Sequence, residues 1–147
     1  LTEKLNGHEQ YLKNLSNIVS TLLKPHDPSF QQLGSKYYYI ESLSRVNWFE
    51  AHNRCKKLGA HLLNLQSKEE FNLVVGQLKY EHYWIDSNEL SKTGDFVSST
   101  TGNRPNFILW HSNEPFGNEN CVEIKKVGSE YAMNDNSCNQ ELYFICE

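Results

Sequence analysis

Apolar side chains recur along the first 23 residues at alternating steps of four and three. The repeating positions are Leu1, Leu5, His8, Leu12, Leu15, Val19 and Leu22. This is the a and d spacing of a coiled coil, in which one stripe of a helix packs against a second helix. The run Lys24-Pro25-His26-Asp27-Pro28 follows, and each proline disfavours helical geometry in the residue before it. We therefore predict a helical neck over residues 1–24 and a linker over residues 25–35.

The neck admits two interpretations. As a coiled coil it would join copies of the chain into a homo-oligomer and turn weak binding sites into avid ones. As a lone amphipathic helix it would pack on its own domain or fray. Gly7 weakens the first turns, because glycine costs about 1 kcal/mol in a helix interior, and His8 is a poor core residue. The unbroken repeat favours the coiled coil and leaves its strand number open.

After the linker, the pattern predicts one strand and then two amphipathic helices. The strand is expected within residues 36–41, where aromatic and β-branched side chains gather. Each helix begins at a capping box, the first formed by Asn47 with Glu50 and the second by Ser67 with Glu70. Their core-facing stripes are Trp48, Ala51, Cys55 and Leu58 in the first helix, and Phe71, Val74, Val75 and Leu78 in the second. Gly59 is expected to end the first helix.

Beyond residue 82 the pattern changes to short apolar stretches separated by long polar loops. Strands are predicted at residues 83–85, 96–97, 121–124 and 143–146. Loops of this length need a structural reason, and a bound ion or disulfides could supply one.

Composition places the chain among soluble globular proteins, with 38% hydrophobic and 22% charged residues. The formal net charge of −4 argues against nucleic acid as the main partner, because phosphate binding needs a basic face. No apolar run approaches the length of a membrane span, so no membrane partner is expected.

Four cysteines, at positions 55, 121, 138 and 146, contain no C-x-x-C pair and favour two structural disulfides. Three pairings are open on the count alone. Disulfides and the sequon Asn14-Leu15-Ser16, a candidate glycosylation site, both indicate a secreted protein. The chain begins at Leu1 rather than Met, so we expect that a leading segment was removed or left out.

The stretch from Trp110 to Cys138 carries the candidate chemistry. Its oxygen-bearing side chains include Glu114, Glu119, Asn134 and Asp135. Carboxylate and amide oxygens are the ligands that calcium takes, and no His or Cys cluster suited to zinc accompanies them. A bridge between Cys121 and Cys138 would bring the two halves of this group together. We interpret it as a binding site.

These residues resemble the C-type lectin domain family over roughly residues 36–147. The shared positions are Ala51, Cys55, Gly59-Ala60, Leu62, Trp84-Ile85, Trp110, Glu114-Pro115, Cys121-Val122-Glu123-Ile124, Asn134-Asp135, Cys138 and Cys146. The resemblance implies an α+β, C-type lectin-like fold: two helices, small antiparallel sheets and a long ligand-binding loop region, preceded here by the N-terminal helix. It also implies disulfides Cys55–Cys146 and Cys121–Cys138, and a cis bond before Pro115.

By the same resemblance, Glu114, Glu119, Asn134 and Asp135 fall on the family's calcium-ligand positions. These four and Phe116 would form the carbohydrate site, with one calcium ion as cofactor. Phe116 departs from the family pattern, because a phenyl ring donates no oxygen. The loop before Cys121 is shorter than in typical mannose binders, and Thr93 and Gly117 replace acidic residues of a second calcium site. Met133 replaces the family's tryptophan.

Two functions follow as hypotheses. The first is a secreted, calcium-dependent lectin that recognises glycans or glycoproteins through this loop. The second is a calcium-independent module of the same fold that binds protein. An enzyme is not expected, because His52, His61, His82 and His111 are scattered without an adjacent nucleophile.

Overall fold

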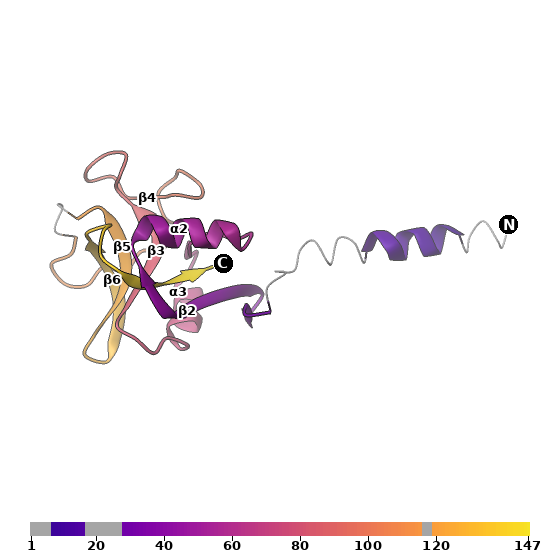
Figure 1. The fold of residues 1–147 in the computed structure, drawn as a ribbon, viewed down its shortest axis with the longest axis horizontal. Coiled ribbons are helices and arrows are strands. Elements are labelled where there is room, and N and C mark those ends of the chain that lie inside the picture. Colours follow the sequence, from indigo (N-terminus) through magenta and orange to yellow (C-terminus); the bar gives the residue numbers. More distant parts are fainter. Residues whose placement is uncertain (1–6, 17–27, 116–118) are drawn as a thin grey trace.

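A computed structural model describes residues 7–16, 28–115 and 119–147. Residues 7–16 are helical (Figure 1), and the rest of the predicted neck lies outside the described residues. Tyr11, Leu12 and Leu15 on this helix are exposed. Phe116 and Gly117 also lie outside the described residues.

The domain is built on a mixed sheet with strand order β1-β2-β7-β3-β5-β6, and β4 pairs with β3 (Figure 1). The strands are β1 (Gln31–Leu33), β2 (Lys36–Val46), β3 (His82–Asn88), β4 (Val97–Ser98), β5 (Cys121–Val127), β6 (Glu130–Asn136) and β7 (Leu142–Cys146). Strands β3 and β7 run parallel, and the other described pairs are antiparallel. With the two helices of the domain, this sheet confirms the predicted α+β fold.

Both helices begin at the predicted caps. Helix α2 spans Trp48–Lys57, and the Asn47 side chain accepts a hydrogen bond from the Glu50 N–H at 2.8 Å. Helix α3 spans Lys68–Val75, and Ser67 Oγ accepts from the Glu70 N–H at 3.1 Å. These side chains satisfy N–H groups that have no partner inside a helix.

Two buried clusters hold the helices on the sheet. One contains Phe71 and Val74 of α3, and the other contains Trp48, Ala51 and Cys55 of α2. Successive residues of β3 alternate between the clusters, as side chains of a strand point to opposite faces. Tyr83 and Ile85 belong to the α3 cluster, and Trp84 belongs to the α2 cluster. The helices therefore cover opposite faces.

Two strands were not predicted from the sequence. Strand β6 carries the polar run Asn134-Asp135-Asn136, which lacks the apolar alternation of a strand. It forms because all seven of its residues pair with β5 in antiparallel register. The other is the three-residue β1, which pairs with the start of β2. The strand predicted at residues 96–97 lies one residue later, at Val97–Ser98.

Candidate functional site

The β5–β6 hairpin brings the sequence-predicted residues to one end of the sheet. In its register, Cys121 lies opposite Asn136, Val122 opposite Asp135, and Glu123 opposite Asn134. The Cys121–Cys138 disulfide closes this end, with 5.2 Å between the two Cα atoms. Since Glu119 precedes β5 by two residues, it lies at the end of the hairpin that carries Asn134 and Asp135.

A second segment runs along the outer edge of β6. Trp110 forms a parallel bridge with Met133, and the His111 N–H donates to the Met133 carbonyl at 2.9 Å. The chain then turns, and the Glu114 N–H donates to the His111 carbonyl at 3.1 Å. The Glu114–Pro115 peptide bond is cis, as the resemblance implies. Glu114 therefore follows a turn, three residues after the last described hydrogen bond to Met133.

The charge at this end is strongly negative. Asp135 is fully buried, and Glu119 is half-buried. The pKa of Glu119 is raised, first by burial and then by the negative charges of Asp135 and Glu123, while Lys125 opposes the shift. A bound cation would reduce the electrostatic repulsion that Asp135 and Glu123 exert on the charged form of Glu119.

The oxygen-bearing side chains at this end are of the kind that calcium binds, although the carboxylates alone do not form a complete set of ligands. Among the described residues, no three His, Cys, Asp or Glu side chains are gathered in a group that could hold a metal ion. Calcium coordination in proteins also draws on amide and backbone carbonyl oxygens, and Asn134 supplies an amide. Asn134 and Asp135 are neighbours on β6, so their side chains point to opposite faces of the sheet. An ion that contacts both side chains would therefore lie at the edge of β6.

Two acids at this end were missed from the sequence. Glu123 has no exposed surface, and its carboxylate accepts from His82 Nδ1 at 2.5 Å and Asn136 Nδ2 at 2.6 Å. Glu89 is 2% exposed; one of its oxygens accepts from the Gly94 N–H, and Oε1 has no hydrogen-bond partner within the described ranges. The polar run that follows Trp84-Ile85 was the available signal for Glu89. Glu123 is one of the positions shared with the family, but no site role was predicted for it, because its alternation with Val122 and Ile124 is also typical of a solvent-facing strand residue.

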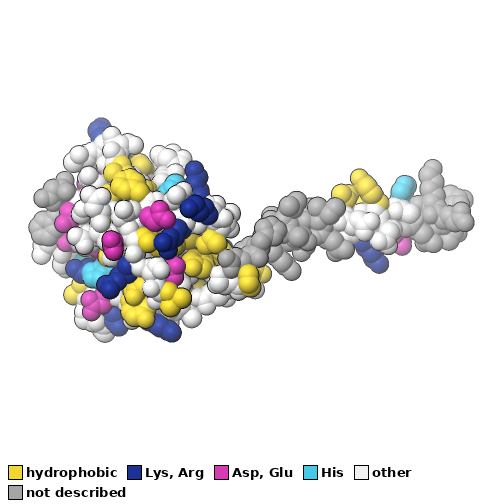
Figure 2. Space-filling model, in the orientation of Figure 1, with side chains coloured by type: hydrophobic (Ala, Val, Ile, Leu, Met, Phe, Trp, Pro, Cys, Tyr) yellow, Lys and Arg dark blue, Asp and Glu magenta, His cyan; other side chains and the backbone are white. Residues whose placement is uncertain are grey.

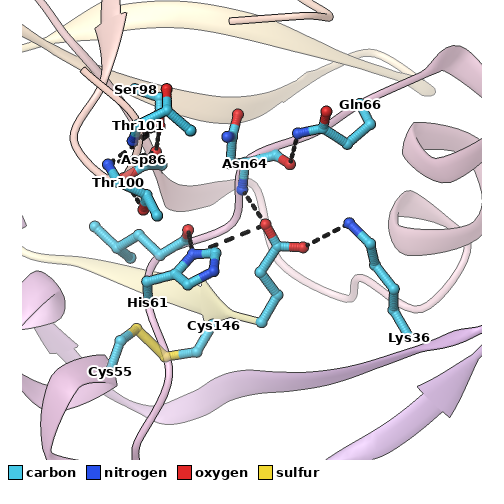
Figure 3. A network of polar contacts seen from close by, with 12 residues as sticks. Lys36, Cys55, His61, Asn64, Gln66, Asp86, Ser98, Thr100, Thr101 and Cys146 are labelled. Carbon is cyan, nitrogen blue, oxygen red and sulfur yellow. Dashed lines mark hydrogen bonds and ion pairs between the residues drawn. A yellow bond between two sulfur atoms is a disulfide. The ribbon is translucent and has the colours of Figure 1, made fainter. Parts of the chain in front are cut away.

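A separate polar cluster joins β2, α3 and the last residue of the chain. Lys36 Nζ lies 3.2 Å from Glu147 Oε2, and the Asn64 N–H donates to Glu147 Oε1 at 2.8 Å (Figure 3). Lys36 Nζ also lies 3.0 Å from Glu70 Oε2 of α3. Burial raises the pKa of Glu147. The Tyr38 hydroxyl donates to Glu70 at 2.5 Å. Since both carboxylates are fully paired, we interpret this cluster as structural.

The surface contains mixed charges. On the face shown in Figure 2, the basic side chains of the described residues lie among acidic ones and form no continuous patch. Within the same described ranges, no helix has the length and apolar character needed to cross a membrane.

Comparisons with known proteins agree with this architecture. The Lectin C-type domain family matches residues 44–147. Over 120 residues the chain is 40% identical to C-type lectin 37Db of Drosophila melanogaster, with 79% of each chain covered. The solved C-type lectin domain of murine dendritic cell inhibitory receptor 2, in complex with N-glycan, superimposes with a TM-score of 0.74 at 24% identity, covering 82% of this chain and 95% of that one. A calcium-independent type II antifreeze protein gives a TM-score of 0.72 at 20% identity, covering 82% and 91% respectively.

The chain therefore belongs to the C-type lectin domain family. This membership confirms the prediction of a binding domain rather than an enzyme. The structure also contains the two disulfides that the resemblance implies, Cys55–Cys146 and Cys121–Cys138.

Proposed function

We propose that this domain is a calcium-dependent lectin that binds glycans at the end of the β5–β6 hairpin. One observation carries the proposal. The hairpin register gathers Glu119, Asn134 and Asp135 at a disulfide-closed end, where buried and half-buried carboxylates repel one another. A bound cation would relieve this repulsion. Glu114, which follows the turn after Trp110-His111, is the fourth proposed ligand.

The side chains have distinct roles in this proposal. Calcium, when bound, supplies coordination positions that two neighbouring sugar hydroxyls can fill. Asp135 and Glu119 provide charge, and Asn134 provides a neutral oxygen. Glu114 accepts a hydrogen bond from a sugar hydroxyl and favours the mannose-like arrangement over the galactose-like one. Phe116 packs on the apolar face of the sugar ring and weakens this preference.

We also propose that the protein is secreted. Two disulfides persist in oxidising compartments and are rare in the cytosol. Asn14 of the sequon is exposed on the described helix, where a glycan would meet no packed side chain. Digestion of the purified protein with an N-glycosidase tests this. A decrease in mass that is seen for the wild type and not for Asn14→Gln would assign the glycan to Asn14.

Calcium titration with thermal unfolding tests the lectin proposal. Calcium should raise the melting temperature, because an ion that binds only the folded state stabilises it by mass action. Asp135→Asn keeps the side-chain shape and should abolish the response, whereas Glu141→Gln, at an exposed acid, should preserve it. Phe116→Asn adds an oxygen donor and should strengthen calcium binding. A melting temperature unchanged by both calcium and EDTA would reject the proposal.

Sugar binding requires its own measurement. A glycan array carrying mannose, fucose and galactose should show calcium-dependent binding that EDTA reverses, with mannose and fucose preferred. Calcium-dependent stability without binding to any sugar would make the ion structural only.

The second candidate function is a calcium-independent module that binds protein. The absence of a closed acidic ligand set among the described residues favours it, as does the likeness in fold to a calcium-independent type II antifreeze protein. It predicts an identical melting temperature in calcium and EDTA. The calcium titration therefore separates the two functions.

We further propose that the N-terminal helix joins copies of the chain. Leu12 and Leu15 of the predicted stripe are 63% and 40% exposed, and the neighbouring Tyr11 is 62% exposed, so this helix has apolar surface to bury against a partner helix. Leu12→Asp should give a monomer in sedimentation equilibrium, whereas Lys13→Asp, outside the predicted stripe, should keep the wild-type mass. A wild-type protein that sediments as a monomer at all concentrations would reject the neck.

A further inference from the structure

We infer that Glu123 is a positioning residue that orients the Asn134 amide, so that the oxygen of this amide faces the proposed ion, with His82 holding the Glu123 carboxylate in place. The inference rests on the proposed calcium site and extends it to residues that would not touch the ion.

The contacts of Glu123 come from both neighbouring strands. Glu123 lies opposite Asn134 of β6 and opposite Trp84 of β3. Its Oε2 accepts from Asn136 Nδ2 at 2.6 Å and from Asn134 Nδ2 at 3.4 Å. Its Oε1 accepts from His82 Nδ1 at 2.5 Å. Paired residues on antiparallel strands project to the same face, so Asn134 and Glu123 meet directly.

A carboxylate at this position decides which end of the amide turns outward. An ionised carboxylate accepts hydrogen bonds and donates none, so the Asn134 amide presents its NH₂ group to Glu123. The two ends of an amide diverge from one carbon, which leaves Oδ1 on the side away from Glu123. Calcium takes amide oxygens and is repelled by amide N–H groups. Without Glu123, both amide orientations become accessible, and one of them faces an ion with the wrong atom.

The energetic cost of Glu123 supports a role beyond folding. A buried carboxylate is desolvated, and well-packed apolar side chains in place of a buried ion pair are often as stable. Glu123 is fully buried and holds His82, Asn134 and Asn136 around it. The charged groups facing His82 are Glu123, Glu81 at 3.8 Å and Lys125, its register partner. Of these three, Glu123 is the one that contacts Asn134 and so reaches the proposed site.

A double-mutant cycle on calcium affinity tests the inference. Glu123→Gln should raise the calcium Kd by about 10- to 100-fold, the usual effect of losing an outer-shell partner. In an Asn134→Asp background the same change should have less than about a threefold effect, because a carboxylate offers an oxygen at either end. Isothermal titration calorimetry on the full chain measures each Kd, and near-UV circular dichroism checks that each variant is folded.

The outcomes separate the inference from the proposed function. A wild-type chain that does not bind calcium rejects both. A wild-type chain that binds calcium, with Glu123→Gln within about twofold of it, rejects the inference alone. An equal loss in the wild-type and Asn134→Asp backgrounds also rejects it, because the effect would then be general to the fold. If Glu123→Gln does not fold, His82→Gln replaces it in the cycle. We then expect a smaller loss of calcium affinity, which should again be seen with Asn134 and not in the Asn134→Asp background.

Discussion

His82 Nδ1 lies 2.5 Å from Glu123 Oε1, and it is the imidazole of this pair that remains accessible to solvent. The Glu123 side chain is 0% exposed, and that of His82 is 37% exposed. The hydrogen bond to Glu123 raises the pKa of His82, and burial opposes this shift. Because a carboxylate accepts and does not donate, Nδ1 carries the proton in this contact. A partly exposed histidine therefore donates a hydrogen bond to a fully buried acid.

The stability of the fold should depend on pH through His82. Its pKa is raised in the folded state, so its stabilising contribution is complete below the ordinary histidine value of 6.5 and is lost as pH rises through the raised value. His82→Gln should therefore lower the melting temperature more at about pH 6 than at about pH 9. Thermal unfolding across this range in EDTA measures the difference.

The control for this measurement is His52→Gln on helix α2, a partly exposed histidine that makes no ion pair among the described residues. It should leave the pH dependence unchanged. A His82→Gln effect of equal size at both ends of the pH range would contradict the charge-pair explanation and leave only loss of packing.

The two disulfides should differ in what they support. Removing a cross-link increases the conformational entropy of the unfolded chain, and more so for a longer closed loop. Cys55 and Cys146 are separated by 91 residues, and Cys121 and Cys138 by 17. Replacing both members by alanine should cost about 4–5 kcal/mol for the first pair and about 3 kcal/mol for the second.

The effect on calcium affinity should follow the opposite order. Removing Cys121–Cys138 should weaken calcium binding more, because this disulfide closes the end of the hairpin that carries the proposed ligands. Urea unfolding measures the stabilities, and calorimetry measures the calcium Kd. If removing Cys55–Cys146 raises the calcium Kd more than removing Cys121–Cys138 does, the hairpin end does not depend on its own cross-link.

The helix caps provide a test of local sequence signals. Ser67→Ala removes the acceptor for the Glu70 N–H and should destabilise the domain by about 1 kcal/mol. Ser67→Asp keeps an acceptor and should retain most of the stability. Ser44→Ala, at an exposed position in β2, serves as the control for loss of a serine hydroxyl. Urea unfolding that ranks Ser67→Asp with Ser67→Ala would contradict a capping role.

The capped helices could be predicted because their signals are local. A side chain such as Ser67 bonds to a backbone group three residues away, so sequence spacing alone identifies it. Strand β6 could not be predicted in this way. Asn134 and Asp135 form part of a strand because β5 pairs with them and the segment through Trp110 borders the opposite edge. These partners are distant in sequence, and no local pattern reports them.

The residues of the candidate site also divide into those that the sequence indicates and those that become evident only from strand pairing. Glu114, Glu119, Asn134 and Asp135 were predicted as ligands from their oxygen chemistry and from the family resemblance. Glu123 was not, because it alternates with Val122 and Ile124, as a solvent-facing residue of a half-buried strand does. The side of β5 that carries Glu123 is closed by His82, Trp84 and the Asn136 amide. Only the pairing of three strands makes this acid a buried one.

The repulsion between acids at the hairpin end gives the last prediction. Asp135 and Glu123 both act on the charge of Glu119, and the surroundings of Glu119 are partly desolvated. Glu119→Gln removes one negative charge with little change in shape, so it should raise the melting temperature in EDTA. It also removes a proposed ligand, so it should reduce or abolish the further rise that calcium produces in the wild type. Glu141→Gln, an equal charge change at an exposed position, should change neither value. A Glu119→Gln variant that melts at a lower temperature in EDTA would show that Glu119 stabilises the calcium-free fold. That result would contradict repulsion among these acids as the dominant effect.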